Sequence, residues 1–223
     1  MPWRRIPLFP LDAVLYPGTP LPLHIFEPRY REMLRVCLAG SRMFGIVPPG
    51  TEREAPDPGA VGCIAEIRAS EELADGRSNI VVVGGSRFFV REVSLEGAPY
   101  LVGTVEEFDD APGPGPSADS LDELRAQFAR YHRAQRELRD AEPDEPSLPE
   151  EPAALTFAVA AALDAEPTVK RRLLALRSAG ERVHLLLRLL PALTAAVTAA
   201  LGVHRRARRN GKGGAPVLLP PES

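Results

Sequence analysis

The chain has 223 residues, of which 44% are apolar and 26% charged, and its formal net charge is −3. These values are typical of a globular protein with its own core, and they exclude a fibrous or largely disordered chain. The two cysteines, Cys37 and Cys63, have no CxxC spacing, which indicates reduced thiols instead of a disulfide framework or a zinc site.

The chain begins with MPWRRIPLFPLDAV, where two arginines are followed by prolines and Asp12. A secretory signal requires an unbroken apolar run after its basic residues. We therefore expect a cytoplasmic protein.

Residues 6–108 have the pattern of a β domain, because short runs rich in Val, Ile, Phe and Leu alternate with Gly, Pro, Asp and Ser. Seven strands and a closed or nearly closed barrel are predicted. The turn Ala74-Asp75-Gly76 predicts a hairpin, since Asp-Gly readily adopts the positive φ of a tight turn. The expected strands are 6–9, 21–26, 43–47, 62–67, 80–83, 88–93 and 100–105.

One helix, 28–39, interrupts the strands. Pro28 suits its first turn and Gly40 its C-cap. The other prolines of this region cannot donate to a central sheet ladder, so they predict strand ends, an edge strand and a turn at Tyr16-Pro17-Gly18. These prolines are Pro10, Pro17, Pro20 and Pro22, and the apolar side of the helix is expected to carry Tyr30, Met33, Leu34, Val36 and Leu38.

Residues 109–117, DDAPGPGPS, predict a linker, because alternating Pro and Gly disfavour helix and ladder alike. Helical spacing follows it. The first helix should begin at the capping box Ser120–Glu123 and the last after a second one, Ser178–Glu181, with a kink at Pro191. The later helices are expected at 153–164, 169–177 and 182–203.

The most apolar segment, 185–201, is interrupted by Arg188 and Pro191. It is shorter than the roughly 20 apolar residues that a bilayer requires. We predict a buried helix and no membrane partner. A basic run, 205–212, follows this segment. Residues 213–223 after it are rich in Gly and Pro, which is typical of a solvated tail.

Together these elements predict an α+β protein in three parts. A β-barrel subdomain with one inserted helix is expected at 1–110, a helical bundle at 111–204, and a basic, Gly/Pro-rich tail at 205–223.

No spacing in the sequence predicts catalysis. The phosphate-binding loop GxxxxGK[ST] is absent, since the only Gly-Lys pair, Gly211-Lys212, is followed by Gly213. The GxSxG motif of serine hydrolases is absent too, and the four histidines lack metal-ligand spacing. The acidic pairs Glu71-Glu72 and Asp109-Asp110 predict a solvated rim. We expect no catalytic residue, no cofactor and no metal.

Several blocks resemble, in order and spacing, the N-terminal substrate-binding domain of Lon proteases. They are IPLFPLDAVLYPGTPLPLHIFEPRYREML, MFGIV, GAVGCIAEI, NIVVVGGSRFFV and PYLVGTVEEF, and ERVHLLLRLL resembles the helical part more loosely. The most specific residues are Pro17-Gly18, Leu21-Pro22-Leu23, Phe26-Glu27 and Arg29-Tyr30.

This resemblance implies a PUA-like β-barrel followed by a helical bundle. It also implies recognition of unfolded or apolar-rich polypeptides, and it allows a partnership with the proteolysis machinery. The sequence ends where full-length Lon continues into ATPase and peptidase modules, so we expect a non-catalytic binding module or adaptor and no enzyme.

RNA binding is the alternative, because PUA-like barrels of other families bind RNA and the C-terminal run is basic. The first 110 residues carry more acidic than basic groups, which argues against nucleic acid as a partner. The candidate peptide contacts are the loop aromatics Tyr16 and Tyr100, with Pro17 beside the first. A role of both tyrosines in closing the barrel ends remains open.

Overall fold

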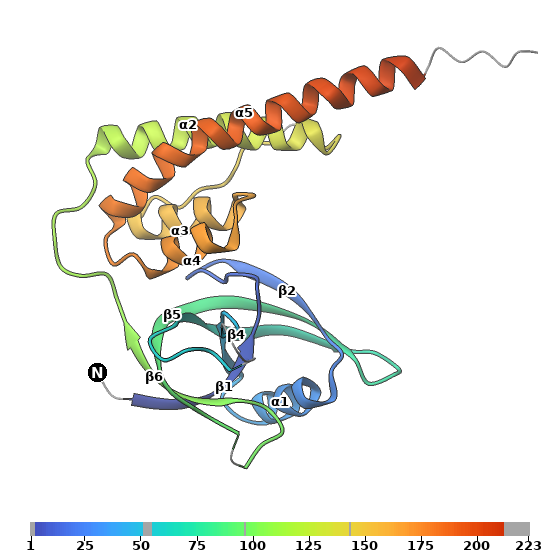
Figure 1. The fold of residues 1–223 in the computed structure, drawn as a ribbon, viewed down its shortest axis with the longest axis vertical. Coiled ribbons are helices and arrows are strands. Elements are labelled where there is room, and N and C mark those ends of the chain that lie inside the picture. Colours follow the sequence, from blue (N-terminus) through green and yellow to red (C-terminus); the bar gives the residue numbers. More distant parts are fainter. Residues whose placement is uncertain (1–2, 51–54, 96, 143, 212–223) are drawn as a thin grey trace, which may run out of the picture. The chain divides into compact units, whose positions relative to one another are not determined.

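The computed structural model describes residues 3–50, 55–95, 97–142 and 144–211 (Figure 1). Its strands are β1 (Trp3–Pro10), β2 (Pro20–Ile25), β3 (Met43–Val47), β4 (Val61–Glu72), β5 (Ser78–Ser94) and β6 (Val102–Phe108). Its helices are α1 (Pro28–Ala39), α2 (Ala118–Leu138), α3 (Pro152–Ala162), α4 (Pro167–Ala175) and α5 (Ala179–Gly211). The prediction of an α+β protein is confirmed.

The strands close into a barrel, as predicted. The sheet order is β2-β5-β4-β3-β1-β6, and β5 also pairs with β6, so five strands form a ring with β2 attached outside it. Strands β1 and β3 run parallel, and the other pairs are antiparallel. Strand β2 pairs with β5 alone among the described strands and is therefore an edge strand.

Strand β5 forms different strand pairs along its two halves. Its first half pairs with β2 and β4, and its second half pairs with β4 and β6. The prediction of two strands at 80–83 and 88–93 is therefore wrong, and the observed count in the described residues is six. The apparent break at Gly84-Gly85 is no turn: a Cβ on Gly84 would lie 2.0 Å from the carbonyl oxygen of Tyr16, so this position requires glycine within a continuous strand.

The predicted hairpin at Gly76 joins β4 to β5. Gly76 has φ of +76°, and the N–H of Leu73 donates to the carbonyl of Arg77 at 2.7 Å. Inside the barrel a Cβ on Gly62 would lie 2.4 Å from Phe88, so small and large residues interdigitate. The buried core cluster is Ile6, Leu8, Val47, Ile64, Phe88, Val90, Leu101 and Val105.

Helix α1 begins at Pro28 and ends before Gly40, as predicted. Its buried side has the spacing i, i+3, i+4, i+7 and consists of Tyr30, Met33, Leu34 and Cys37. Val36 is 40% exposed, so its assignment to the buried side is wrong, because it lies about a third of a turn away from that stripe. The prolines lie at the ends of β1 and β2, inside edge strand β2 and before Gly18, which agrees with their predicted roles.

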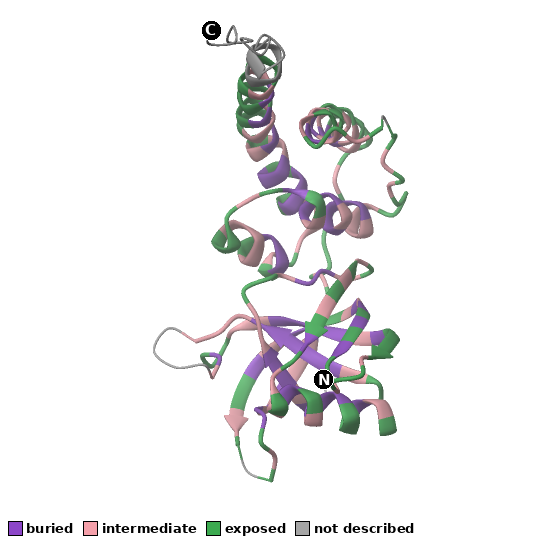
Figure 2. Ribbon diagram, turned by 90° about the vertical axis from the view of Figure 1, so that its right-hand side faces the viewer, coloured by how far each residue is buried: buried purple, intermediate pink, exposed green. Residues whose placement is uncertain are grey.

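The described chain divides into two compact units. The first contains residues up to Ser117 together with Leu148–Leu185, and the second contains Ala118–Ser147 and the chain from Leu186. Helices α3 and α4 thus belong to the barrel unit, which differs from the sequence-based division at residue 110. Figure 2 shows the burial of the residues within each part.

The helical boundaries differ from the sequence-based ones at several ends. Helix α2 begins at Ala118, so Ser120 lies in its first turn and is no N-cap. Ser178 does cap α5, because its hydroxyl accepts from the N–H of Glu181 at 3.3 Å. Helix α5 continues past the expected end near Val203 to Gly211, and the predicted tail beyond that residue lies outside the described residues.

In the second unit, α2 buries one stripe and α5 another. Leu190, Val197 and Leu201 are buried on α5, and Glu137 forms an ion pair with Arg205. The segment Ala179–Arg206 is long and apolar enough to cross a membrane by length and composition, a test that core helices of soluble proteins also pass. Only 17% of its most apolar window is buried, so the prediction of a buried helix is wrong for most of this segment. The buried side chains of α2 are Leu124, Phe128, Tyr131 and Gln135.

Candidate functional site

The two tyrosines proposed as peptide contacts are buried. Tyr16 is 0% and Tyr100 7% exposed, and burial raises the pKa of both phenols. Pro17 is half-buried and forms an isolated bridge with Gly84. Both tyrosines lie outside the strands and helices, as expected, but the expectation that they are accessible is wrong.

Tyr16 is buried because its turn is fastened to strand β5. The N–H of Gly18 donates to the carbonyl of Gly84 at 2.8 Å, and the N–H of Gly84 donates to the carbonyl of Thr19 at 3.0 Å. The Tyr16 side chain then points to the helices of the same unit. Its hydroxyl donates to the carbonyl of Lys170 at 2.9 Å, and its ring centroid lies 6.0 Å from that of Phe157.

A cluster of charges joins the same helices to the barrel. Arg87 of β5 is 4% and Arg182 of α5 is 0% exposed, and both guanidinium groups contact the carboxylate of Asp110, at 2.5 Å and 2.6 Å. Arg87 also donates to the carbonyls of Leu174 and Leu176. The expectation of a solvated rim is wrong for Asp110, which links the barrel, the linker and the end of α4.

The electrostatics of this cluster are those of a structural contact. Partial burial alone would raise the pKa of Asp110, but hydrogen bonds from Arg182 and the charges of both arginines lower it below its usual value. Burial lowers the pKa of Arg87, and Asp110 opposes that effect. The guanidinium of Arg182 also lies 4.1 Å from the ring centroid of Phe157.

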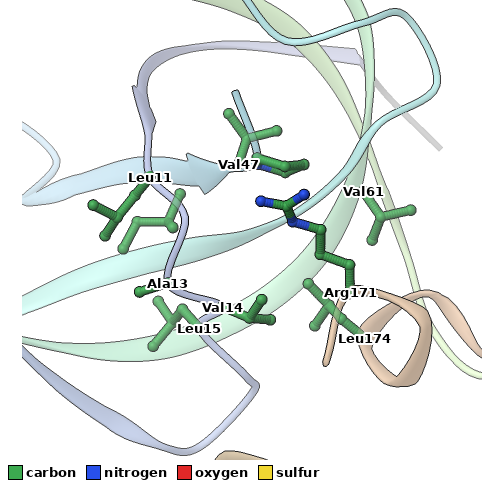
Figure 3. A pocket seen from close by; sticks show the side chains of 10 residues that line it. Leu11, Ala13, Val14, Leu15, Val47, Val61, Arg171 and Leu174 are labelled. Atoms are coloured by element: carbon green, nitrogen blue, oxygen red, sulfur yellow. The ribbon is translucent and has the colours of Figure 1, made fainter. Parts of the chain in front are cut away.

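A small hollow next to this region is no ligand site. Figure 3 shows Arg171 of α4 pointing in among Leu11, Val47 and Val61, and the cavity measures about 10 Å³. That volume admits one water molecule at most. Arg171 instead donates to the carboxylate of Asp12 at 3.0 Å, which ties α4 to the loop between β1 and β2.

A larger hollow lies on the outer face of the barrel, where β5 runs between β2 and β4. We call it the β2–β5–β4 groove, and its volume is about 460 Å³. The register places Pro22 opposite Val81 and Val81 opposite Ala69, so an apolar row crosses three strands. Val81 is 38% exposed. The groove therefore offers an accessible apolar floor. Its lining is completed by Leu23, His24, Ser70, Glu71, Asn79 and Ile80.

Polar side chains form one rim of the groove. The Nδ1 of His24 lies 2.8 Å from the amide oxygen of Asn79, and the guanidinium of Arg77 lies 3.4 Å from Nε2 of His24. Arg77 in turn pairs with Asp75 at 2.7 Å. The exposed ring of Phe26 stacks on His24 with centroids 6.1 Å apart, and it extends the apolar surface beyond the groove.

The free edge of β2 presents acceptors but few donors. Pro20 and Pro22 have no N–H, so their pairs with Val83 and Val81 are the non-hydrogen-bonded pairs of this antiparallel ladder. Their carbonyls point to the free edge. Of Pro20, Pro22 and His24, the alternate residues that face this edge, only His24 has an N–H. An incoming strand could form only part of a ladder here. The geometry favours contacts made by side chains in the groove.

The described thiols are not available for chemistry at the surface. Cys37 and Cys63 are buried, and burial raises the pKa of their thiols to about 11 and about 12. No group of three or more potential metal ligands occurs within the described ranges. An apolar floor with a polar rim is typical of a surface that recognises an apolar side chain.

Sequence reasoning missed most residues of this groove. Val81 belongs to the run Ile80–Val83, which has no alternation and was interpreted only as a strand. His24, one of the four histidines without metal-ligand spacing, is exposed in β2. The signal that could have found the groove is the pair Pro20 and Pro22, because prolines indicate an edge strand and the hairpin at Gly76 places β5 beside it.

The family described as the ATP-dependent protease La (LON) substrate-binding domain matches residues 5–192. The chain belongs to this family. The match includes the barrel and the helices α2 to α4, and it confirms the resemblance seen in the sequence blocks.

Lon proteases are among the curated relatives. Those of Parabacteroides distasonis and Flavobacterium johnsoniae are 32% and 27% identical over 110 and 111 residues. Each alignment includes 47% of this chain and 13% of the relative, so only a small part of those proteases corresponds to this chain.

Two solved structures share the fold. The Lon N-terminal domain protein from Xanthomonas campestris has a TM-score of 0.63 at 22% identity and covers 83% of this chain and 98% of its own. The N-terminal domain of the Mycobacterium avium complex Lon protease has a TM-score of 0.60 at 23% identity, with coverages of 86% and 98%.

Proposed function

We propose that this chain is a polypeptide-binding module and that the β2–β5–β4 groove holds apolar side chains of an unfolded or extended segment. The observation that carries the proposal is the exposed apolar row Pro22, Val81 and Ala69 within a hollow of about 460 Å³. Membership of a substrate-binding-domain family supports it. The candidate site thus moves from Tyr16 and Tyr100 to the outer sheet face.

The module has no catalytic activity of its own in this proposal, and it acts in the cytoplasm as an adaptor that delivers polypeptides to the proteolysis machinery. Support comes from the missing phosphate-binding and serine-hydrolase motifs of the sequence. Purified protein should hydrolyse neither ATP nor casein above a mock preparation. Turnover that persists through further purification would contradict this part.

Affinity for a labelled unfolded peptide, measured by fluorescence anisotropy, tests the groove. A dissociation constant on the order of micromolar is expected, since one module gains no avidity. Val81→Ser should weaken binding about three- to tenfold by removing apolar contact area at the centre of the groove.

Val36→Ser is the matched control, because Val36 is 40% exposed on α1 whereas Val81 is 38% exposed in the groove. It should leave the affinity unchanged. Equal affinities of both variants and the native chain would place the binding surface elsewhere. Binding of structured RNA that weakens steeply with salt, without binding of any peptide, would overturn the proposal.

A further inference from the structure

We propose that the groove selects segments in which an apolar residue and a lysine or arginine lie two positions apart. The inference rests on the proposed function and specifies its substrate class. It follows from the charges around the groove, from the strand register, and from the spacing of side chains in an extended chain.

The groove carries an unneutralised negative charge. Glu71 lines it, and within the described residues neither Glu71 nor its neighbour Glu72 has an ion pair or a hydrogen-bonded side-chain partner. Two other charged pairs nearby are matched, because Glu66 pairs with Arg68 at 2.5 Å and Asp75 pairs with Arg77 at 2.7 Å, and the guanidinium of Arg31 lies against the hairpin at Gly76. Polypeptide with a cation next to its apolar residue therefore complements this surface.

The register places the carboxylate at a defined distance from the apolar row. Ala69 lies opposite Val81, and Glu71 lies opposite Asn79, so the two cross-strand pairs are successive on the outer face. Residues two apart on a strand are separated by about 6.8 Å. An extended ligand has the same spacing between side chains on one side. Its apolar side chain can thus lie on Val81 while a basic side chain at i+2 or i−2 reaches Glu71.

The size of the preference is limited by exposure. Glu71 is exposed, and solvent-exposed ion pairs are weak, so a basic residue should tighten binding about two- to fivefold over a neutral one. Added salt should reduce this preference, because it weakens the attraction between exposed charges; the Debye length is already about 8 Å at physiological ionic strength.

Three labelled peptides test the inference, identical except for Lys, Gln or Glu placed both two positions before and two positions after a central leucine, so that either chain direction is covered. The native chain should bind them in the order Lys, Gln, Glu. Glu71→Gln should remove the advantage of Lys and leave the affinity for the Gln peptide unchanged. Glu92→Gln is the matched control, because Glu92 is an exposed glutamate on the other half of β5, and it should preserve the order.

The outcomes separate the two proposals. Equal affinities for all three peptides, or a Lys preference that persists in Glu71→Gln, would overturn this inference and leave the polypeptide-binding function intact. Failure to bind any of the three would overturn both. Loss of the preference in Glu92→Gln as well would show a diffuse effect of net charge and contradict a role for Glu71.

Discussion

The two halves of strand β5 differ in how far their side chains are exposed to solvent. Arg87, in the second half, is 4% exposed beneath the helices of its own unit, whereas Val81, in the first half, is 38% exposed on the outer face. A charged residue is buried and an apolar one is accessible. Residue type alone therefore does not separate the part of the strand that holds the fold from the part that is free to bind.

The difference lies in what covers each half. The covered end of the barrel contains Tyr16, Arg87 and Asp110. The partners of their polar groups are Lys170 of α4, Leu176 after α4 and Arg182 of α5. In such contacts the polar groups of the side chains are already hydrogen-bonded within the protein. The groove has an open floor, and its side chains remain available to a ligand.

The largest expected effect comes from removing the carboxylate of the covered end. Asp110→Ala leaves Arg87 and Arg182 buried without their counter-charge, which should lower the free energy of unfolding by about 3 kcal/mol. Chemical denaturation measures it. Asp109→Ala is the control, since that neighbouring side chain is exposed, and it should change stability by less than about 0.5 kcal/mol. Equal losses in both variants would contradict a specific role for the Asp110 carboxylate at the covered end.

The acid dependence of stability should sharpen the same contrast. The arginines depress the pKa of Asp110 in the folded protein, so its stabilising contribution is complete above the unfolded-state pKa, about 3.9. That contribution is lost as pH falls from there through the lower folded-state value. In Asp110→Asn the group cannot titrate, so the stability difference between native and variant should narrow below about pH 4. A difference that stays constant down to acid unfolding would contradict the ion-pair account.

The elements of this fold were predictable where the cause is local. Pro28 and Gly40 bound α1, the Asp-Gly turn joins β4 to β5, and Ser178 caps α5, each through its own backbone preference. Positions that depend on distant partners were not. Tyr16 is buried because Lys170 and Phe157 reach it from 154 and 141 positions away, and no nearby pattern encodes that contact.

The candidate site illustrates the same limit. Prolines in β2 indicate an edge strand, but the groove exists only because Val81 lies beside Pro22 on one side and Ala69 on the other. The register of three strands decides that placement. The run of valines in β5 gives no alternation from which the exposed face could be inferred.

A smaller effect is expected at Tyr16. Tyr16→Phe removes the hydroxyl that donates to the carbonyl of Lys170, which should lower the free energy of unfolding by about 1 to 2 kcal/mol, because a buried acceptor loses its partner. Tyr100→Phe is the control, since the Tyr100 hydroxyl has no hydrogen bond among the described residues, and it should cost less than about 0.5 kcal/mol. Both variants should bind unfolded peptide like the native chain. Weaker binding by either one at unchanged stability would return the tyrosines to the binding surface.

The smallest effect on stability is expected at the edge of the open half. Pro22→Thr restores an N–H that points away from β5, at a position where the native edge has a carbonyl and no donor. Unfolding free energy should fall by less than about 1 kcal/mol, mainly through the greater freedom of the unfolded chain. The new donor completes more of a ladder for a second strand, so the variant should associate with itself at concentrations where the native chain is monodisperse. Pro167→Thr provides the comparison, because that exposed proline begins α4 and adds no donor to a sheet edge. Sedimentation over a range of concentrations measures both variants; identical behaviour of the two would mean that the prolines of β2 do not limit strand addition at this edge.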